Sequence, residues 1–196
     1  MKRPHLGSYL RTLLLVGLLP LASCTTTIKP GARDTHYAAG EKIHLKLALN
    51  LTDELRNAKW EQRALTGGGT VMAVGPALTQ DAPQFARSTF MEVVEINNGS
   101  SPSKPVDATL TPKMAFIGID YGQTMFSNDT ITIKLEWTLA DQAGNVLWAD
   151  TVTGKGVSKG GFAKDLKLAL EDVFRKSQDT MLSSQAIQQL VAKKYP

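Results

Sequence analysis

The clearest potential for chemistry lies in residues 156–160 (GVSKG), which fit the pattern G-x-S-x-G. In hydrolases this pattern places a nucleophilic serine on a sharp turn between a strand and a helix, and such elements are predicted on either side here. A hydrolase of this type needs a histidine after the serine, but no histidine follows His44. A Ser158–Lys159 dyad is the remaining possibility, although neighbouring side chains in an extended chain point apart. We therefore predict a polar turn, no catalytic residue and no enzymatic activity.

Other residues with chemical potential also have simpler structural roles. His44 has no companion cysteine or histidine in the predicted domain, so no metal site is predicted. Residues 67–69 (GGG) lack the Gly-Lys-Ser/Thr that completes a phosphate-binding loop. Trp137 and Trp148 could line an aromatic ligand site, but such residues more often pack across a hairpin or in a core. The sequence therefore predicts no cofactor.

The elements that would position these residues include three well-marked strands. Apolar residues alternate with polar ones over residues 43–51 and again over 131–139, which is the period of a strand with one buried face. Residues 141–145 (DQAGN) are typical of a hairpin loop, and residues 146–153 are predicted to return as the partner strand. The leucines of the first strand and the Ile/Leu/Trp row of the second are expected to face the core.

The remaining elements are assigned from weaker patterns. They are a short helix from Thr52 to about residue 60 or 63, a strand at 71–78, a helix at 81–97, a strand at 106–120 broken near Pro112, and a helix at 162–194 interrupted near 183–184. This order predicts an α+β fold with a mixed or antiparallel sheet of about four to five strands and two main helices packed on one face.

The N-terminus has the composition of an export signal. Basic residues precede a short apolar run that is too brief to span a bilayer, which takes about 20 residues. The run ends in Leu21-Ala22-Ser23-Cys24, which resembles the lipobox of bacterial lipoproteins. The resemblance implies that residues 1–23 are a signal peptide and that Cys24, the only cysteine, becomes the lipidated N-terminus. An ordinary secretory signal is the alternative.

Lipidation would fix the location of the protein, because several acyl chains give stable membrane attachment. Thr25 stands where an aspartate would retain a lipoprotein at the inner membrane, so the resemblance implies the periplasmic face of the outer membrane in a Gram-negative source. Residues 24–40 are predicted to be a flexible tether and residues 41–196 a single α+β domain. Removal of the signal lowers the formal charge from +4 to +1, which gives no electrostatic basis for binding nucleic acid. The oligomeric state is not predicted.

A second resemblance begins at residue 106. The segments VDATLTP (106–112) and ITIKLEWTLADQAGNVLWADTVTGKG (131–156), followed by a long helix, resemble small α+β envelope lipoproteins. These include auxiliary lipoproteins of ABC-type transport systems, the lipopolysaccharide-assembly lipoprotein, and the curli-secretion and penicillin-binding-protein-activator lipoproteins. The resemblance implies a non-enzymatic accessory subunit of an envelope protein complex, in lipid transport or assembly. The alternative is a small-molecule or lipid-binding periplasmic module, which would require an apolar cavity between sheet and helices.

Overall fold

The computed structural model describes residues 25–28, 40–63, 69–122, 128–158 and 161–196. Its strands are β1 (Thr25–Ile28), β2 (Ile43–Leu51), β3 (Lys59–Arg63), β4 (Gly69–Ala73), β5 (Phe90–Asn97), β6 (Ala108–Asp120), β7 (Thr130–Ala140) and β8 (Val146–Val157). Its helices are α2 (Asp53–Arg56), α3 (Gly75–Thr89), α4 (Phe162–Ser183) and α5 (Gln185–Lys194). The predicted α+β fold is confirmed.

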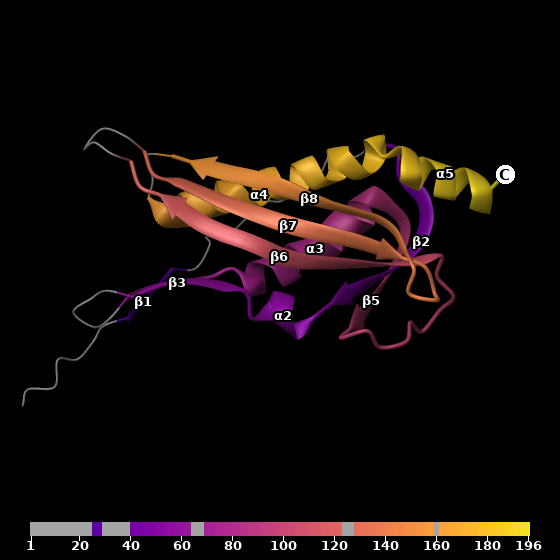
Figure 1. Ribbon diagram of the computed structural model, residues 1–196, viewed down its shortest axis with the longest axis horizontal. Coiled ribbons are helices and arrows are strands. Elements are labelled where there is room, and N and C mark those ends of the chain that lie inside the picture. Colours follow the sequence, from indigo (N-terminus) through magenta and orange to yellow (C-terminus); the bar gives the residue numbers. More distant parts are fainter. Residues whose placement is uncertain (1–24, 29–39, 64–68, 123–127, 159–160) are drawn as a thin grey trace, which may run out of the picture.

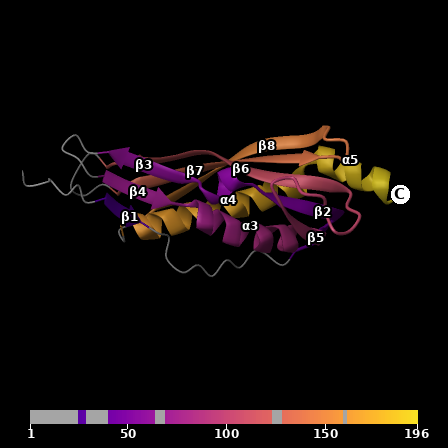
Figure 2. The same ribbon diagram turned by 90° about the horizontal axis from the view of Figure 1, so that it is seen from below.

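The strands form two sheets. The larger sheet has the order β5-β2-β6-β7-β8, in which β2 is parallel to both β5 and β6, and β7 is antiparallel to β6 and β8. The smaller sheet, with the order β1-β4-β3, was not predicted. Figure 1 shows β6, β7 and β8 in front of α3 and α4, and Figure 2 shows the same layers from below. The main helices therefore cover one face of the larger sheet, as predicted.

The core lies between this sheet and the helices. The alternation predicted for β7 is confirmed, since Leu135 and Trp137 are fully buried whereas Lys134, which precedes Leu135, is exposed. Trp137 packs against Phe85 of α3, with ring centroids 4.9 Å apart, and against Phe174 of α4. Burying an aromatic side chain of this size removes a large apolar area from water, so this cluster is a main source of stability.

Two glycines of β8 allow α4 to approach the sheet closely. A Cβ atom added at Gly154 would lie 2.4 Å from the carbonyl oxygen of Ala169, and one added at Gly156 would lie 1.8 Å from that of Asp165. Both distances are far shorter than real Cβ contacts, and the obstructing atoms belong to helix backbone. The first glycine of the G-x-S-x-G pattern therefore has a packing role.

Three helix and strand assignments were wrong. The short helix starts as predicted, with Thr52 Oγ1 accepting from the Leu55 amide, but it ends at Arg56 and β3 follows. Helix α3 starts at Gly75 and not at residue 81, because Pro76 stands in its first turn, where a missing amide proton costs nothing. Residues 90–97 form strand β5 and not the end of a helix, because they pair in parallel with β2.

The other boundaries differ less from prediction. The helix break near 183–184 is confirmed, since Ser184 ends α4 and caps α5 by accepting from the Ile187 amide. Strand β6 runs through Pro112 without a break, because its pairing with β2 ends before this residue. The irregularity in β6 lies instead between Met114 and Phe116. Of the tether predicted for residues 24–40, only 25–28 and 40 are described, and residues 25–28 form β1 and not coil.

Candidate functional site

The structure does not bring the sequence-derived catalytic candidates together. Ser158 follows the end of β8, whereas His44 is the second residue of β2, whose start lies at the opposite end of the sheet (Figure 1). Lys159 lies outside the described residues, and so does Cys24, the predicted lipidation site. Ser158 and His44 are therefore too far apart to act together.

The two tryptophans both have packing roles. The indole Nε1 of Trp137 donates to Ser177 Oγ at 2.8 Å inside the aromatic cluster. Trp148 is partly buried and lies opposite Leu139 on the helix-covered side of the sheet. The space between sheet and helices is thus filled by side chains around these two residues. Among the described residues, no group of three or more His, Cys, Asp or Glu side chains could hold a metal ion.

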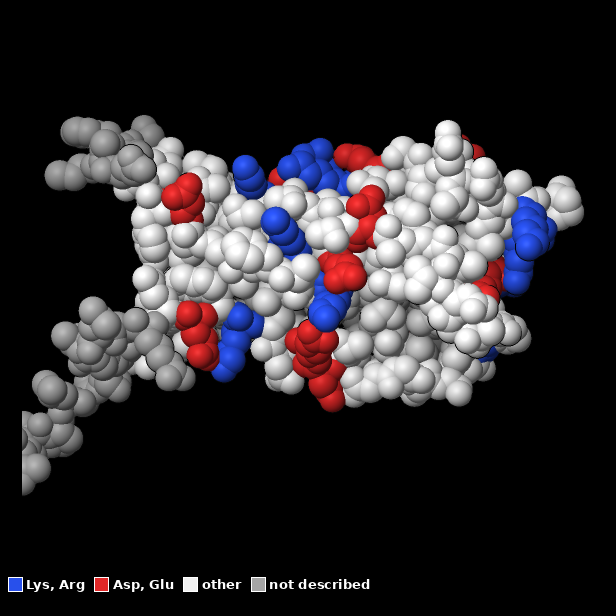
Figure 3. All heavy atoms as spheres, in the orientation of Figure 1, with Lys and Arg blue, Asp and Glu red and all other residues white. Residues whose placement is uncertain are grey.

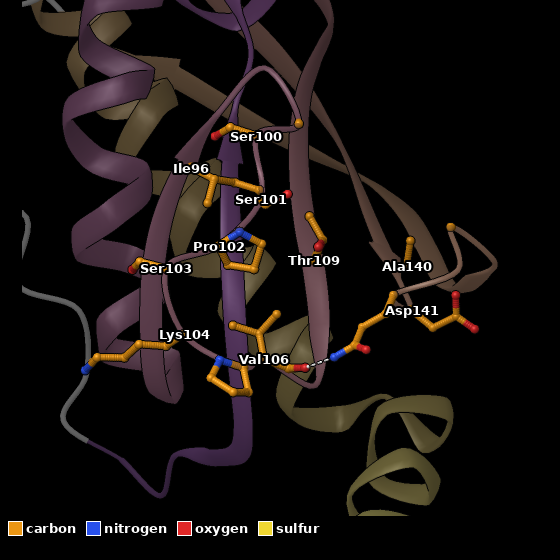
Figure 4. A pocket seen from close by; sticks show the side chains of 14 residues that line it. Ile96, Ser100, Ser101, Pro102, Ser103, Lys104, Val106, Thr109, Ala140 and Asp141 are labelled. Carbon is orange, nitrogen blue, oxygen red and sulfur yellow. Dashed lines mark hydrogen bonds between the residues drawn. The ribbon is translucent and has the colours of Figure 1, made fainter.

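A pocket of about 730 Å³ lies instead over the open face of the larger sheet, which is the face opposite the helices. It lies at the end of the sheet where β7 meets β8, which we call the pocket end. One wall is the loop of residues 99–106 that follows β5 (Figure 4). The other wall is the β7–β8 hairpin from Ala140 to Gly144, and Thr109 of β6 lies between them. The volume lies within the range of about 300–1,000 Å³ that is typical of ligand sites.

The lining combines hydroxyl groups with a small apolar floor. Ser100, Ser101 and Thr109 supply hydroxyls, and each can donate one hydrogen bond and accept others. Ile96 and Val106 supply the floor, where they belong to a second hydrophobic cluster separate from the main core. Lys104 and Asp141 contribute to the rim, but their side chains point away from the pocket (Figure 4). The interior therefore suits an uncharged ligand or an uncharged stretch of polypeptide.

The hairpin wall is held by one carboxylate. Asp141 Oδ1 accepts from the amides of Ala143 and Asn145, at 2.9 and 2.8 Å, and its Oδ2 accepts from the Asn145 side chain at 2.9 Å. These hydrogen bonds, led by that of the Asn145 side chain, hold the pKa of Asp141 below its ordinary value. Gly144 has a φ of 86°, which favours glycine. The turn is therefore fixed before any ligand binds.

The loop wall is held at both of its ends. At its start, the Gly99 amide donates to Asn50 Oδ1 at 2.8 Å, and the Ser100 amide donates to the Asn97 carbonyl. Near its end, the Gln142 side chain donates to the Val106 carbonyl at 2.7 Å and so joins the two walls (Figure 4). A pocket whose walls are fixed in this way loses less entropy when a ligand binds.

Asp107, next to that wall, fastens the C-terminal residues to the sheet. Its Oδ2 accepts from the Lys46 amide at 2.9 Å and from the Tyr195 hydroxyl at 2.8 Å, and its Oδ1 lies 3.4 Å from Lys194 Nζ. Burial raises the pKa of the Asp107 carboxyl, but these hydrogen bonds and the charge of Lys194 outweigh burial and hold the pKa below its ordinary value. The loop, β2 and α5 thus share one ionised carboxylate.

A second pocket, of about 330 Å³, lies between the start of β2 and the junction of α4 and α5. His44 belongs to its lining, beside mostly apolar residues such as Met181, Ile187 and Val191. His44 therefore borders a cavity, but none of the hydrogen bonds described joins it to an acidic or nucleophilic side chain.

Only part of the larger pocket could be recognised from the sequence. Residues 99–105 and 141–145 were both recognisable as loops from their Gly, Ser, Pro and Asp content. Their proximity follows from the sheet order, because β5 and β7 lie on opposite sides of the β2–β6 pair. This order depends on the parallel pairing of β5 with β2, which the sequence did not predict.

Charge is unevenly distributed over the open face. Lys113, Lys134 and Glu136 lie near the middle of β6 and β7, and Figure 3 shows a band of basic and acidic side chains across the middle of this face. Between this band and the pocket end of the sheet the surface is almost free of charge (Figure 3).

No described helix is both long enough and apolar enough to cross a bilayer.

The fold has counterparts among solved structures, although no family model and no curated protein matches the chain. Protein XCC0632 from Xanthomonas campestris, of family DUF330, is 16% identical, with 87% of this chain and 97% of that protein covered and a TM-score of 0.53. The PelC dodecamer from Paraburkholderia phytofirmans is 14% identical, covering 73% and 93%, with a TM-score of 0.41. A minor lipoprotein from Acinetobacter baumannii is 11% identical, covering 80% and 97%, with a TM-score of 0.39. At 16% identity, the likeness to XCC0632 shows a shared fold.

Proposed function

We propose that the protein is a lipoprotein held by Cys24 at the periplasmic face of the outer membrane. The support is the order of residues 1–24, in which basic residues, a short apolar run and Leu-Ala-Ser-Cys follow one another. An α+β domain then follows the cysteine, as in the envelope lipoproteins that the sequence resembles. Three acyl chains on one cysteine would keep such a domain on the membrane surface.

In this proposal the domain is a non-enzymatic accessory subunit of envelope machinery for lipid transport or assembly. The observation that supports this role best is the prearranged, uncharged pocket beside a charge-poor region of the open sheet face. Surfaces with few charges and a fixed shape are typical of the central part of protein interfaces. We infer that a segment of a partner protein occupies this pocket.

A second function, the binding of a small uncharged molecule, is favoured by the volume of the same pocket. A long acyl chain fits this site poorly, because the apolar floor formed by Ile96 and Val106 is small. The ligand in this alternative would be a small molecule with several hydrogen-bonding groups, because hydroxyls line the walls.

The anchoring is tested by Cys24→Ser. We expect the variant to appear in the soluble periplasmic fraction or as an uncleaved precursor, whereas the wild type remains with outer membranes after fractionation. Mass measurement of the N-terminal peptide should show acyl chains in the wild type. A cleaved variant that stays on the membrane would contradict lipid anchoring.

The role of the pocket is tested by photo-crosslinking in intact cells. A photoreactive amino acid replaces Ser101 in the pocket wall, and in a matched variant it replaces Thr151 on the open face of β8; both positions are exposed. A protein subunit should crosslink at position 101 and not at 151. A small molecule that co-purifies with the wild type, without any protein crosslink, would favour the alternative function. Equal crosslinking at both positions would contradict a specific role for the pocket.

A further inference from the structure

The strand next to Cys24 limits where the membrane can be. Strand β1 begins at Thr25, the residue directly after Cys24, and Thr25 lies opposite Gly69 of β4. Cys24 is covalently bonded to Thr25, so a lipid on Cys24 is attached next to the first residue of β1. A lipid on Cys24 would therefore bring this end of the smaller sheet to the bilayer surface, without an intervening tether.

The same end of the molecule contains one end of the larger sheet, opposite to the pocket. There β6 ends at Asp120, β7 begins at Thr130 and β8 ends at Val157, as the pairs Asp120–Thr130 and Thr130–Val157 show. The Tyr121 hydroxyl donates to Gln62 Oε1 at 2.6 Å and so connects the end of β6 to β3. Figures 1 and 2 agree that β1, β3 and the ends of β6 and β8 lie together, far from the C-terminus.

Apolar and aromatic side chains are exposed at this end. Tyr121 is 46% exposed and Val157 is 47% exposed. The rings of Tyr121 and Phe162 meet edge to face, with centroids 6.0 Å apart. Tyrosine is favoured at the boundary between membrane and water, because its ring is apolar and its hydroxyl can remain hydrated.

We propose that this end, defined by Thr25, Tyr121, Val157 and Phe162, rests on the bilayer that holds the lipid, so that the molecule stands upright. The proposal depends on the lipidation of Cys24 proposed above. Strand β8 then spans from the bilayer to the pocket end of the sheet, and its 11 steps of about 3.3 Å hold the pocket roughly 36 Å from the membrane surface. The pocket would thus be presented to partners in the periplasm at a fixed height.

The two ends of β8 provide a matched test. Val157 and Val146 are the same residue type, both exposed, at opposite ends of one strand. A lipid attached through the sulfur of Cys24 leaves no free thiol, so Val157→Cys and Val146→Cys each introduce a single labelling site into the full lipidated chain. Each variant is labelled with an environment-sensitive fluorophore and reconstituted into phosphatidylethanolamine/phosphatidylglycerol vesicles that contain a headgroup spin-labelled lipid.

We expect the spin label to quench the fluorophore at position 157 several-fold more strongly than the one at position 146. Equal quenching at both positions would mean that the molecule lies flat, and stronger quenching at 146 would mean that the pocket end faces the membrane; either result overturns the proposal. The N-terminal mass of the same samples reports lipidation separately. An unlipidated Cys24 contradicts the proposed anchoring, whereas a lipidated protein without the expected difference contradicts the orientation alone. Unfolding curves that match the wild type confirm that both variants are folded.

Discussion

The two faces of the five-stranded sheet differ in what covers them. On one face, Leu135, Trp137 and their neighbours in β7 are fully buried under α3 and α4. On the other face, the alternate residues of β7, such as Lys134 and Glu136, lie open to solvent or half-buried, and the loop after β5 covers part of the surface. The comparison shows a division of roles, in which one face provides stability and the other provides the surface for recognition.

The largest difference between the faces is expected from neighbouring residues of β7. Leu135→Ala removes a fully buried side chain and should lower the free energy of unfolding by about 2–5 kcal/mol. Lys134→Ala should cost at most about 1 kcal/mol, because the exposed ammonium group contributes little more than its contact with the Phe116 ring, 5.6 Å away. Urea denaturation of the two variants measures both values. Similar losses would mean that both faces are buried in solution, for example by a partner.

A pair of glycines tests the same contrast through backbone contact. Gly156→Ala directs a methyl group at the α4 backbone and should cost about 1–3 kcal/mol, since either the helix or the strand must move. Gly118→Ala points to the open face, where its nearest neighbour is the end of the exposed Phe116 ring, 2.5 Å away. That ring can rotate, so the change should be nearly neutral. Thermal unfolding compares the two, and a tolerated Gly156→Ala would contradict the close approach of α4.

Asp107 tests how firmly the loop on the open face is held. Asp107→Asn should lower the free energy of unfolding by about 1–2 kcal/mol at pH 7, because hydrogen bonds to a half-buried charge are lost. The pKa of Asp107 is lower in the folded protein than its ordinary value of 3.8, so this stabilisation is present above pH 3.8 and disappears as the pH falls through the folded pKa.

The difference between wild type and Asp107→Asn should therefore shrink in acid, as urea denaturation at pH 7 and pH 3 can show. Tyr195→Phe is a milder control that removes one of the hydrogen bonds and leaves the charge in place. A difference that stays constant with pH would show that the asparagine acts through packing and not through the lost charge.

The smallest effects are expected at Ser158 and His44, the residues considered for catalysis in the sequence analysis. Ser158→Ala and His44→Ala should each change the free energy of unfolding by no more than about 0.5 kcal/mol and should restore the wild-type envelope phenotype in a deletion strain. The reason is that the two residues lie at opposite ends of the sheet. Loss of function in a folded Ser158→Ala variant would favour a catalytic role.

Local patterns predicted those elements whose two faces differ clearly. Strands β2 and β7 alternate between buried and exposed residues, so their period was visible in the sequence. Strand β5 was mistaken for a helix because Ala86, Phe90, Val93 and Val94 also fit helical spacing. At the edge of the sheet its residues are partly buried on both faces, so no strict alternation results. Likewise, Gly75 and Pro76 fit either a strand bulge or the first turn of a helix.

The sequence alone determined the alternating strands, the hairpin between β7 and β8, the two C-terminal helices and the likeness of residues 21–24 to a lipobox, because each depends on residues close together in the chain. Only the tertiary structure decided the order of the strands, the parallel place of β5, the pairing of β1 with β4 and the pocket between the 99–106 loop and the hairpin. These features depend on contacts between segments far apart in the chain. They are stabilised when the apolar faces of such segments are buried against each other, and no local pattern specifies which faces will meet.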